Sequence, residues 1–126
     1  MSFLIMSTHI CEALVVSCID FRLQKKIQKW LSKNFKNKAY DYVGFAGASK
    51  DLKIILKQLD ISVRLHKIKQ VVLIHHEDCG AYGKDSTPEN HARDLKKAKK
   101  KITKLYPKLQ TNLYYLHLDG KFDEVK

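Results

Sequence analysis

Residues 71–80, VVLIHHEDCG, run from four consecutive apolar side chains directly into two histidines, two acids and a cysteine. A short continuous apolar run that is rich in β-branched residues is typical of a strand that is buried on both faces. We therefore predict a buried strand over 71–74, with its carboxyl end leading into His75 and His76.

Similar but weaker patterns predict three further strands and a C-terminal hairpin. The segment 13–17 (ALVVS) is another continuous apolar run, and 40–43 and 113–118 are short segments of the same kind. Asp119-Gly120 is a strong hairpin signal that leads into a last short segment, 121–125.

Helical spacing of apolar residues fills the intervals between the predicted strands. Residues 22–35 carry an apolar stripe opposite a Lys- and Gln-rich face. A second helix follows Ser49, which we predict to be its N-cap with Asp51 in the first turn. A third begins at Thr87-Pro88, because Pro suits a first helical turn, and ends at Pro107.

The resulting order is β-α-β-α-β-α-β with a hairpin-like tail. Strands that alternate with helices predict an α/β fold, in which a mostly parallel sheet is flanked by helices. The chain has 126 residues and contains no linker or internal repeat, so we expect a single domain over 1–126.

Composition narrows the expected location and partners. No run of about eighteen apolar residues is present, and segment 1–10 has no basic region or cleavage signature of a signal peptide. We therefore expect a cytoplasmic protein without a membrane span. The net charge is +11, but the lysines are spread over predicted helix faces without aromatic residues between them. We expect a solvated lysine-rich surface and no nucleic-acid partner.

Three cysteines, Cys11, Cys18 and Cys79, do not indicate a disulfide framework, because their number is odd. Thiols near a histidine in a reducing compartment favour metal ligands or reactive groups. We interpret Cys11, which belongs to none of the strand-end motifs described below, as a small buried or boundary residue.

Three motifs follow the ends of predicted strands. Cys18 closes the first strand, 44–47 (GFAG) closes the second, and His76 closes the third. Ligands in open α/β sheets bind beyond the carboxyl ends of the strands, so we expect these motifs to form one site.

The residue types at that edge predict a metal centre. His76-x-x-Cys79 lets two ligands reach one ion, and Cys18 adds a third. Catalytic zinc sites commonly keep three protein ligands and leave a fourth position for water or substrate. Asp20 and Arg22 would add an acid-base pair beside the metal.

In order and spacing, these motifs resemble those of the β-class carbonic anhydrases over about the first two-thirds of the chain. The resemblance implies a parallel α/β sheet, Zn²⁺ bound by Cys18, His76 and Cys79, and a catalytic dyad of Asp20 and Arg22. It also implies a homodimer with active sites at the interface.

The implied activity is that of a zinc lyase that interconverts CO₂ and bicarbonate. Zinc lowers the pKa of bound water to about 7, so that hydroxide is available to attack CO₂. Asp20 would accept a hydrogen bond from that nucleophile, and Arg22 would hold Asp20 by a two-pronged ion pair. If Arg22 released it, Asp20 could become the fourth zinc ligand and close the site.

One departure from the family pattern keeps alternatives open. The family usually has Arg-Asn-Ala-Gly where this chain has Gly44-Phe45-Ala46-Gly47. The alternatives are hydrolysis of another small substrate, such as a carbon-sulfur compound, and a non-catalytic zinc protein closed by Asp20. Phe21, Phe45 and Tyr82 are candidate pocket walls or core residues.

The remaining polar residues allow two interpretations each. His75 is either a proton shuttle or a packing histidine, and His91 could approach the site from the nearby loop. The carboxylates of Glu77 and Asp78 could accept hydrogen bonds from metal ligands or face solvent. We assign structural roles to His9, His66 and His117.

Overall fold

The computed structural model describes residues 9–126, so most of the segment in which we expected no signal peptide lies outside the described residues. The described chain contains one five-stranded sheet with the strand order β2-β1-β3-β4-β5. The strands are β1 (Ala13–Ser17), β2 (Tyr40–Gly44), β3 (Gln70–His76), β4 (Gln110–Leu116) and β5 (Phe122–Glu124).

Four of the five strands are parallel, as the sequence predicts. β1 pairs in parallel with β2 and β3, and β3 pairs in parallel with β4. β5 turns back antiparallel to β4, which confirms the predicted hairpin. Several strand boundaries differ from the prediction. β3 continues through His75 and His76, and β4 begins at Gln110, because both strands keep pairing over this length.

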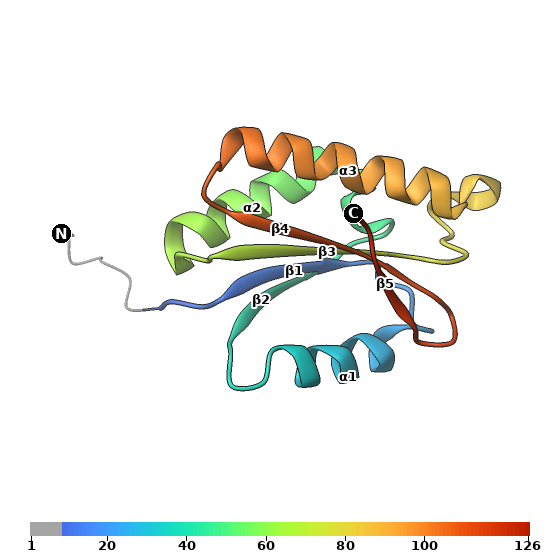
Figure 1. Cartoon of the computed structure of the whole chain (residues 1–126), viewed down its shortest axis with the longest axis horizontal. Coiled ribbons are helices and arrows are strands. Elements are labelled where there is room, and N and C mark those ends of the chain that lie inside the picture. The colour runs from blue at the N-terminus through green and yellow to red at the C-terminus, as the bar shows by residue number, and fades with distance from the viewer. Residues whose placement is uncertain (1–8) are drawn as a thin grey trace.

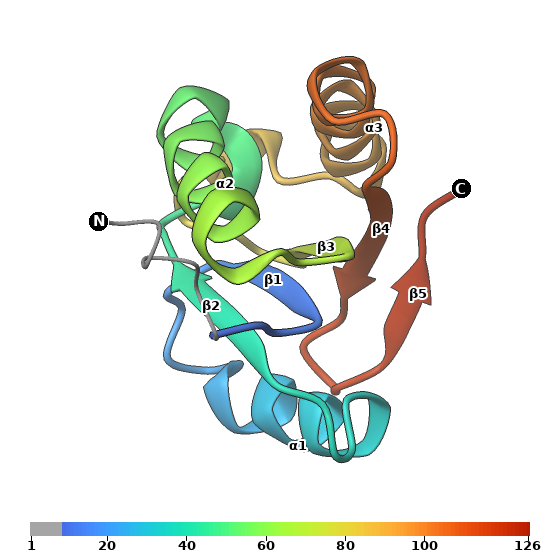
Figure 2. The same ribbon diagram turned by 90° about the vertical axis from the view of Figure 1, so that its left-hand side faces the viewer.

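Helices cover both faces of the sheet (Figure 1). Figure 2 shows α1 (Gln24–Asn34) alone on one face, with α2 (Leu52–His66) and α3 (Pro88–Leu105) on the other. Two short 3₁₀ turns, η2 (Ala48–Lys50) and η3 (Gly83–Asp85), follow β2 and β3. The predicted α/β fold is therefore confirmed.

The two apolar cores follow the two-residue period of the strands. In β3, Val71 and Leu73 pack in the core of α2 and α3, whereas Val72 and Ile74 pack in the core of α1. Successive side chains of a strand point to opposite faces of the sheet. The alternation continues at the carboxyl end of β3, where it places the side chains of His75 and His76 on opposite faces of the sheet.

The two predicted helix starts had different outcomes. Thr87 caps α3, because its hydroxyl accepts a hydrogen bond from the Asn90 backbone N–H at 3.1 Å, and Pro88 is the first helical residue. The prediction that Ser49 caps α2 is wrong. Ser49 lies in η2, and its hydroxyl is hydrogen-bonded to His75 Nε2 at 2.7 Å. Asp51 takes the N-cap position without a side-chain hydrogen bond.

A search of the described helices for one long and apolar enough to cross a membrane finds none.

Leu59 and Leu65 of α2 form a matched pair for testing the core. Leu59 is fully buried, and Leu65 is 46% exposed. We predict that Leu59→Ala lowers the free energy of unfolding by about 2–5 kcal/mol, because it leaves a cavity. Leu65→Ala should change it by less than about 0.5–1 kcal/mol. Urea denaturation followed by circular dichroism measures both, and equal losses would contradict this assignment of the core.

Candidate metal centre

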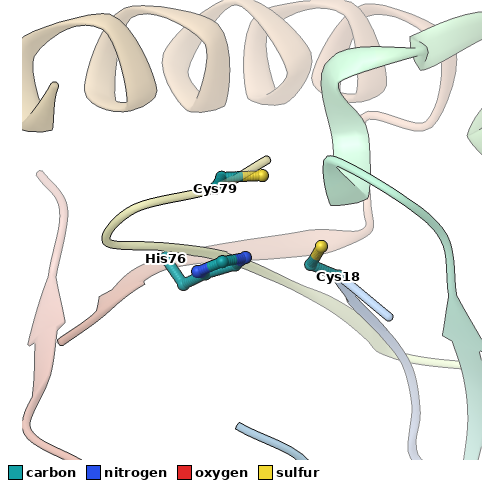
Figure 3. A group of neighbouring side chains, drawn as sticks. All are labelled: Cys18, His76 and Cys79. Carbon is teal, nitrogen blue, oxygen red and sulfur yellow. The ribbon is translucent and has the colours of Figure 1, made fainter. Parts of the chain in front are cut away.

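Three side chains from separate parts of the chain converge beyond the carboxyl ends of β1 and β3. Cys18 directly follows β1, His76 ends β3, and Cys79 lies in the loop after it. Figure 3 shows the two sulfurs and the imidazole turned toward a common space. All three residues are buried, and one potential ligand atom of each lies within 4.8 Å of the others.

The hydrogen bonding of His76 leaves one ring nitrogen available to a metal. Nδ1 donates to the backbone carbonyl of Glu77 at 2.6 Å, which puts the lone pair on Nε2. Nε2 is buried and has no hydrogen-bond partner among the described residues. A buried polar atom without a partner is costly, and a metal ion between this nitrogen and the two sulfurs would satisfy it.

Cys18 and Cys79 shift each other's pKa in opposite directions. The hydrogen bond from Cys79 lowers the pKa of Cys18 to about 3, against the effect of burial, and His76 lowers it further. The same hydrogen bond and burial raise the pKa of Cys79. These shifts favour Cys18 as the thiolate of the pair, and a metal ion bound by both sulfurs would displace a remaining thiol proton. The donor set fits Zn²⁺, which binds thiolate and neutral imidazole.

The turn after β2 completes the surroundings of Cys18. The Gly47 backbone N–H donates to Cys18 Sγ at 3.4 Å. Gly47 has φ +80°, and a Cβ at this position would lie 3.0 Å from the Ala81 Cβ. Only glycine allows both the left-handed conformation and this close approach between the β2 turn and the loop that carries Cys79.

Asp20 and Arg22 form a two-pronged ion pair beside the cysteine-histidine cluster. Arg22 Nη2 lies 2.6 Å from Asp20 Oδ2, and Arg22 Nε lies 3.1 Å from Oδ1. The Arg22 backbone N–H also donates to Oδ1 at 2.9 Å. The hydrogen bonds from Arg22 lower the pKa of Asp20 to about 2, so this carboxylate is ionised at neutral pH.

Arg22 also joins the two sequence motifs. Its Nη1 donates to the Asp78 carboxylate at 3.0 Å, and its Nη2 donates to the Asp78 carbonyl oxygen at 2.9 Å. Asp20 Oδ2 lies 3.9 Å from His76 Nε2. The structure thus brings together the five residues that the sequence singled out: Cys18, Asp20, Arg22, His76 and Cys79.

The carboxylates of Glu77 and Asp78 do not accept hydrogen bonds from the candidate ligands. The Glu77 carboxylate accepts from the Leu118 backbone N–H at 2.9 Å, and only its backbone oxygen contacts His76. Asp78 instead holds Arg22, which makes it a supporting residue for the ion pair that the sequence did not reveal.

An open cleft of about 680 Å³ lies against this cluster. Phe21 is 85% exposed and lines it, as we expected of a pocket wall. Phe45 packs against the core shared by α2 and α3, and Tyr82 is buried against Cys18 and Cys79. The cleft is lined by Cys18, Ile19, Asp20, Phe21, Arg22, Ala46, Asp78, Gly80 and Ala81.

A buried histidine pair supports the Cys79 loop from the opposite face of β3. His75 Nδ1 lies 2.9 Å from His91 Nδ1, and His91 Nε2 lies 2.9 Å from Ser86 Oγ. Ser86 Oγ accepts from the Cys79 backbone N–H at 2.8 Å. His75 is only 1% exposed, so it packs in the interior. His91 reaches the centre indirectly, from α3 through Ser86.

Both histidines are held neutral by their surroundings. Burial and the neighbouring His91 lower the pKa of His75 to about 3. Burial, and to a smaller extent the neighbouring His76, lowers the pKa of His91 to about 4. Each can therefore donate one ring N–H and accept at the other nitrogen, as this chain of hydrogen bonds requires.

Comparison with known proteins identifies the family. Residues 8–126 match the family model described as "Putative carbonic anhydrase". The chain belongs to this carbonic anhydrase family. It is also 30% identical to an uncharacterized protein of Rickettsia bellii, over 90% of this chain and 81% of the relative. An uncharacterized protein of Rickettsia conorii is 30% identical, over 90% of this chain and 72% of the relative.

Solved structures share the fold at low sequence identity. A carbonic anhydrase from Glaciozyma antarctica has a TM-score of 0.71 at 17% identity, covering 96% of this chain and 86% of its own. A carbonic anhydrase from Streptococcus mutans has a TM-score of 0.66 at 16% identity, covering 95% of this chain and 85% of its own. The fold is that of the β-carbonic anhydrases, as the sequence motifs predicted.

Three glycine variants separate the two constraints on Gly47, which are its left-handed backbone conformation and its close approach to Ala81. We predict that Gly47→Ala destabilises most, because it adds about 1–2 kcal/mol of left-handed strain to a steric conflict worth about 1–3 kcal/mol. Gly83→Ala should show strain alone, since its φ is +56° in open space, and Gly80→Ala should show neither effect. Urea denaturation tests this order, and a Gly47→Ala variant as stable as Gly80→Ala would refute the packing argument.

The neutral histidines predict a loss of stability in mild acid. An unfolded histidine, with a pKa of about 6.5, takes up a proton that folded His91 refuses until about pH 4. The free energy of unfolding should therefore fall between these values, by up to about 1.4 kcal/mol per pH unit for each such histidine.

Replacement of His91 tests how steeply the free energy of unfolding depends on pH. His91→Gln should make the decline between pH 6.5 and 4 shallower, because it removes one of the two groups. Denaturant titrations at several pH values, with the same excess of chelator for both proteins, measure the effect. Identical slopes would mean that His91 is not held neutral.

Proposed function

We propose that this chain is a zinc-dependent carbonic anhydrase, a lyase that interconverts CO₂ and bicarbonate. One observation carries the proposal: the buried Nε2 of His76 lies close to two cysteine sulfurs. The ionised Asp20 lies beside this group and lines the adjacent cleft. Membership of the family and the shared fold support the same activity.

Cys18, His76 and Cys79 would hold the Zn²⁺ ion. Two thiolates and a neutral imidazole balance the charge of the ion, and the buried positions of all three protect the ligands from solvent. When bound, zinc supplies a Lewis acid that lowers the pKa of a coordinated water toward neutrality. Gly47 would keep the Cys18 thiolate oriented through its N–H.

Asp20 would act as the hydrogen-bond acceptor that orients the attacking nucleophile. Its carboxylate is ionised at neutral pH and lies 3.9 Å from His76 Nε2, on the wall of the cleft. A carboxylate in this position can accept a hydrogen bond from an attacking water and direct its lone pair toward CO₂. Phe21 and Ile19 would provide the apolar surface against which that uncharged molecule lies.

The ion pair supports an open rather than a closed centre. Arg22 occupies both carboxylate oxygens of Asp20, and Asp78 in turn holds Arg22. Asp20 would have to give up these contacts to become a fourth ligand. The alternative of a non-catalytic zinc protein closed by Asp20 requires this rearrangement.

The exposed apolar side chains beside the cleft support a homodimer. Ile19 is 60% exposed and Phe21 is 85% exposed, and both lie next to the candidate centre. Large apolar groups gathered at a site favour contact with a partner. We infer that a second copy covers this face, and we retain a single domain and a cytoplasmic location, which the free cysteines favour.

Two substitutions test the metal and the dyad separately. Cys79→Ser should abolish both zinc binding at this centre and CO₂ hydration. Asp20→Asn should retain the zinc but lower hydration by about 10²-fold or more, because it replaces the anionic hydrogen-bond acceptor that orients the nucleophile. Elemental analysis measures the zinc, and stopped-flow spectroscopy measures hydration.

Asp119→Asn, in the turn before β5, is the matched control and should leave both measurements unchanged. Carbonyl sulfide serves as the competing substrate in the same assay. Hydration that survives Cys79→Ser would overturn the proposal. Turnover of carbonyl sulfide without CO₂ hydration would show that the carbon-sulfur compound is the substrate of this centre. Zinc without either activity would favour the closed, non-catalytic protein.

A further inference from the structure

A second group of potential metal ligands lies at the opposite, amino-terminal edge of the sheet. Cys11 precedes β1, Asp41 is the second residue of β2, and His66 ends α2. One potential ligand atom of each lies within 4.8 Å of the others, and all three residues are half-buried. We propose that Cys11, Asp41 and His66 bind a second zinc ion, separate from the centre at Cys18, His76 and Cys79.

Hydrogen bonds hold these side chains together. Asp41 Oδ2 accepts from His66 Nδ1 at 2.7 Å and from Ser62 Oγ at 2.6 Å. The Cys11 backbone N–H donates to the His66 carbonyl oxygen at 3.0 Å, which fixes the start of β1 against the end of α2. The thiol, carboxylate and imidazole are therefore already positioned by backbone and side-chain contacts.

The donor set suits zinc in both type and charge. Thiolate, carboxylate and neutral imidazole are all zinc ligands, and one thiolate with one carboxylate balances a divalent ion. Binding would release the proton of the Cys11 thiol, and His66 would coordinate as a neutral imidazole.

His9 lies beside the proposed site. It lies two residues before Cys11, and its ring contacts that of His66 edge-on with centroids 6.4 Å apart. Structural zinc sites are almost always four-coordinate with protein ligands. The second ion would tie the segment before β1 to both β2 and α2, and its role would be structural.

The proposal predicts the zinc content of a set of variants. The wild type should bind about two zinc ions per chain, one for each cluster. Cys11→Ser and Cys79→Ser should each bind about one, and the double variant should bind none. Elemental analysis after zinc loading and removal of weakly bound metal gives these values. His66→Gln should lose the same ion as Cys11→Ser, which guards against a folding defect in one variant.

His117→Asn is the matched control. His117 Nε2 contacts the Asp123 carboxylate at 2.6 Å, the same kind of histidine-acid pair without a thiol, so its loss should leave two ions bound. Zinc should also raise the Tm of Cys79→Ser, which retains only the second site, but not that of the double variant.

The two metal proposals fail in different ways. An unchanged zinc content in Cys11→Ser and His66→Gln would overturn the second site and leave the catalytic centre intact. A zinc content that is unchanged in Cys79→Ser but lower in Cys11→Ser would overturn the catalytic centre and retain the second site.

Discussion

The parallel pairing of β1 with β3 is the constraint on which the candidate centre depends. Val16 is in register with Leu73, so Cys18 and His76 emerge at the same edge although 57 residues of chain lie between them. The pairing of β1 with β2 brings the Gly47 turn to the same place. Backbone hydrogen bonds between the strands and the two apolar cores fix these three strand ends. The strands therefore position the side chains that follow them.

Arg22 fixes the position of Asp20 beside the candidate centre. It holds the Asp20 carboxylate with both prongs and is itself held by Asp78 from the loop that carries Cys79. The acid therefore stays ionised and faces the cleft, at the cost of ordering one exposed arginine. The Gly44-Phe45 departure does not disturb this pair, since Phe45 packs against the core instead of lining the cleft.

The two metal-type clusters differ in burial and in what surrounds them. The cluster of Cys18, His76 and Cys79 is buried beside an open cleft, as a reactive centre requires. The cluster of Cys11, Asp41 and His66 is half-buried among hydrogen bonds that join strand and helix ends. The proposed division of roles follows from this difference: one ion for reaction, and one for fixing the amino-terminal edge.

The sequence alone determined the alternation of strands and helices, the mostly parallel sheet and the edge at which the five motif residues meet, because apolar runs and their polar ends are local signals. The order of the strands within the sheet came only from the tertiary structure. The sequence did not assign His75, since only the alternation of β3, once extended through His76, sends the two histidines to opposite faces. Ser49 likewise looked like a helix cap until His75 provided its partner. No motif or short spacing in the sequence links Cys11, Asp41 and His66. Only the tertiary structure decided this grouping, because packing brings β1, β2 and α2 together at one end.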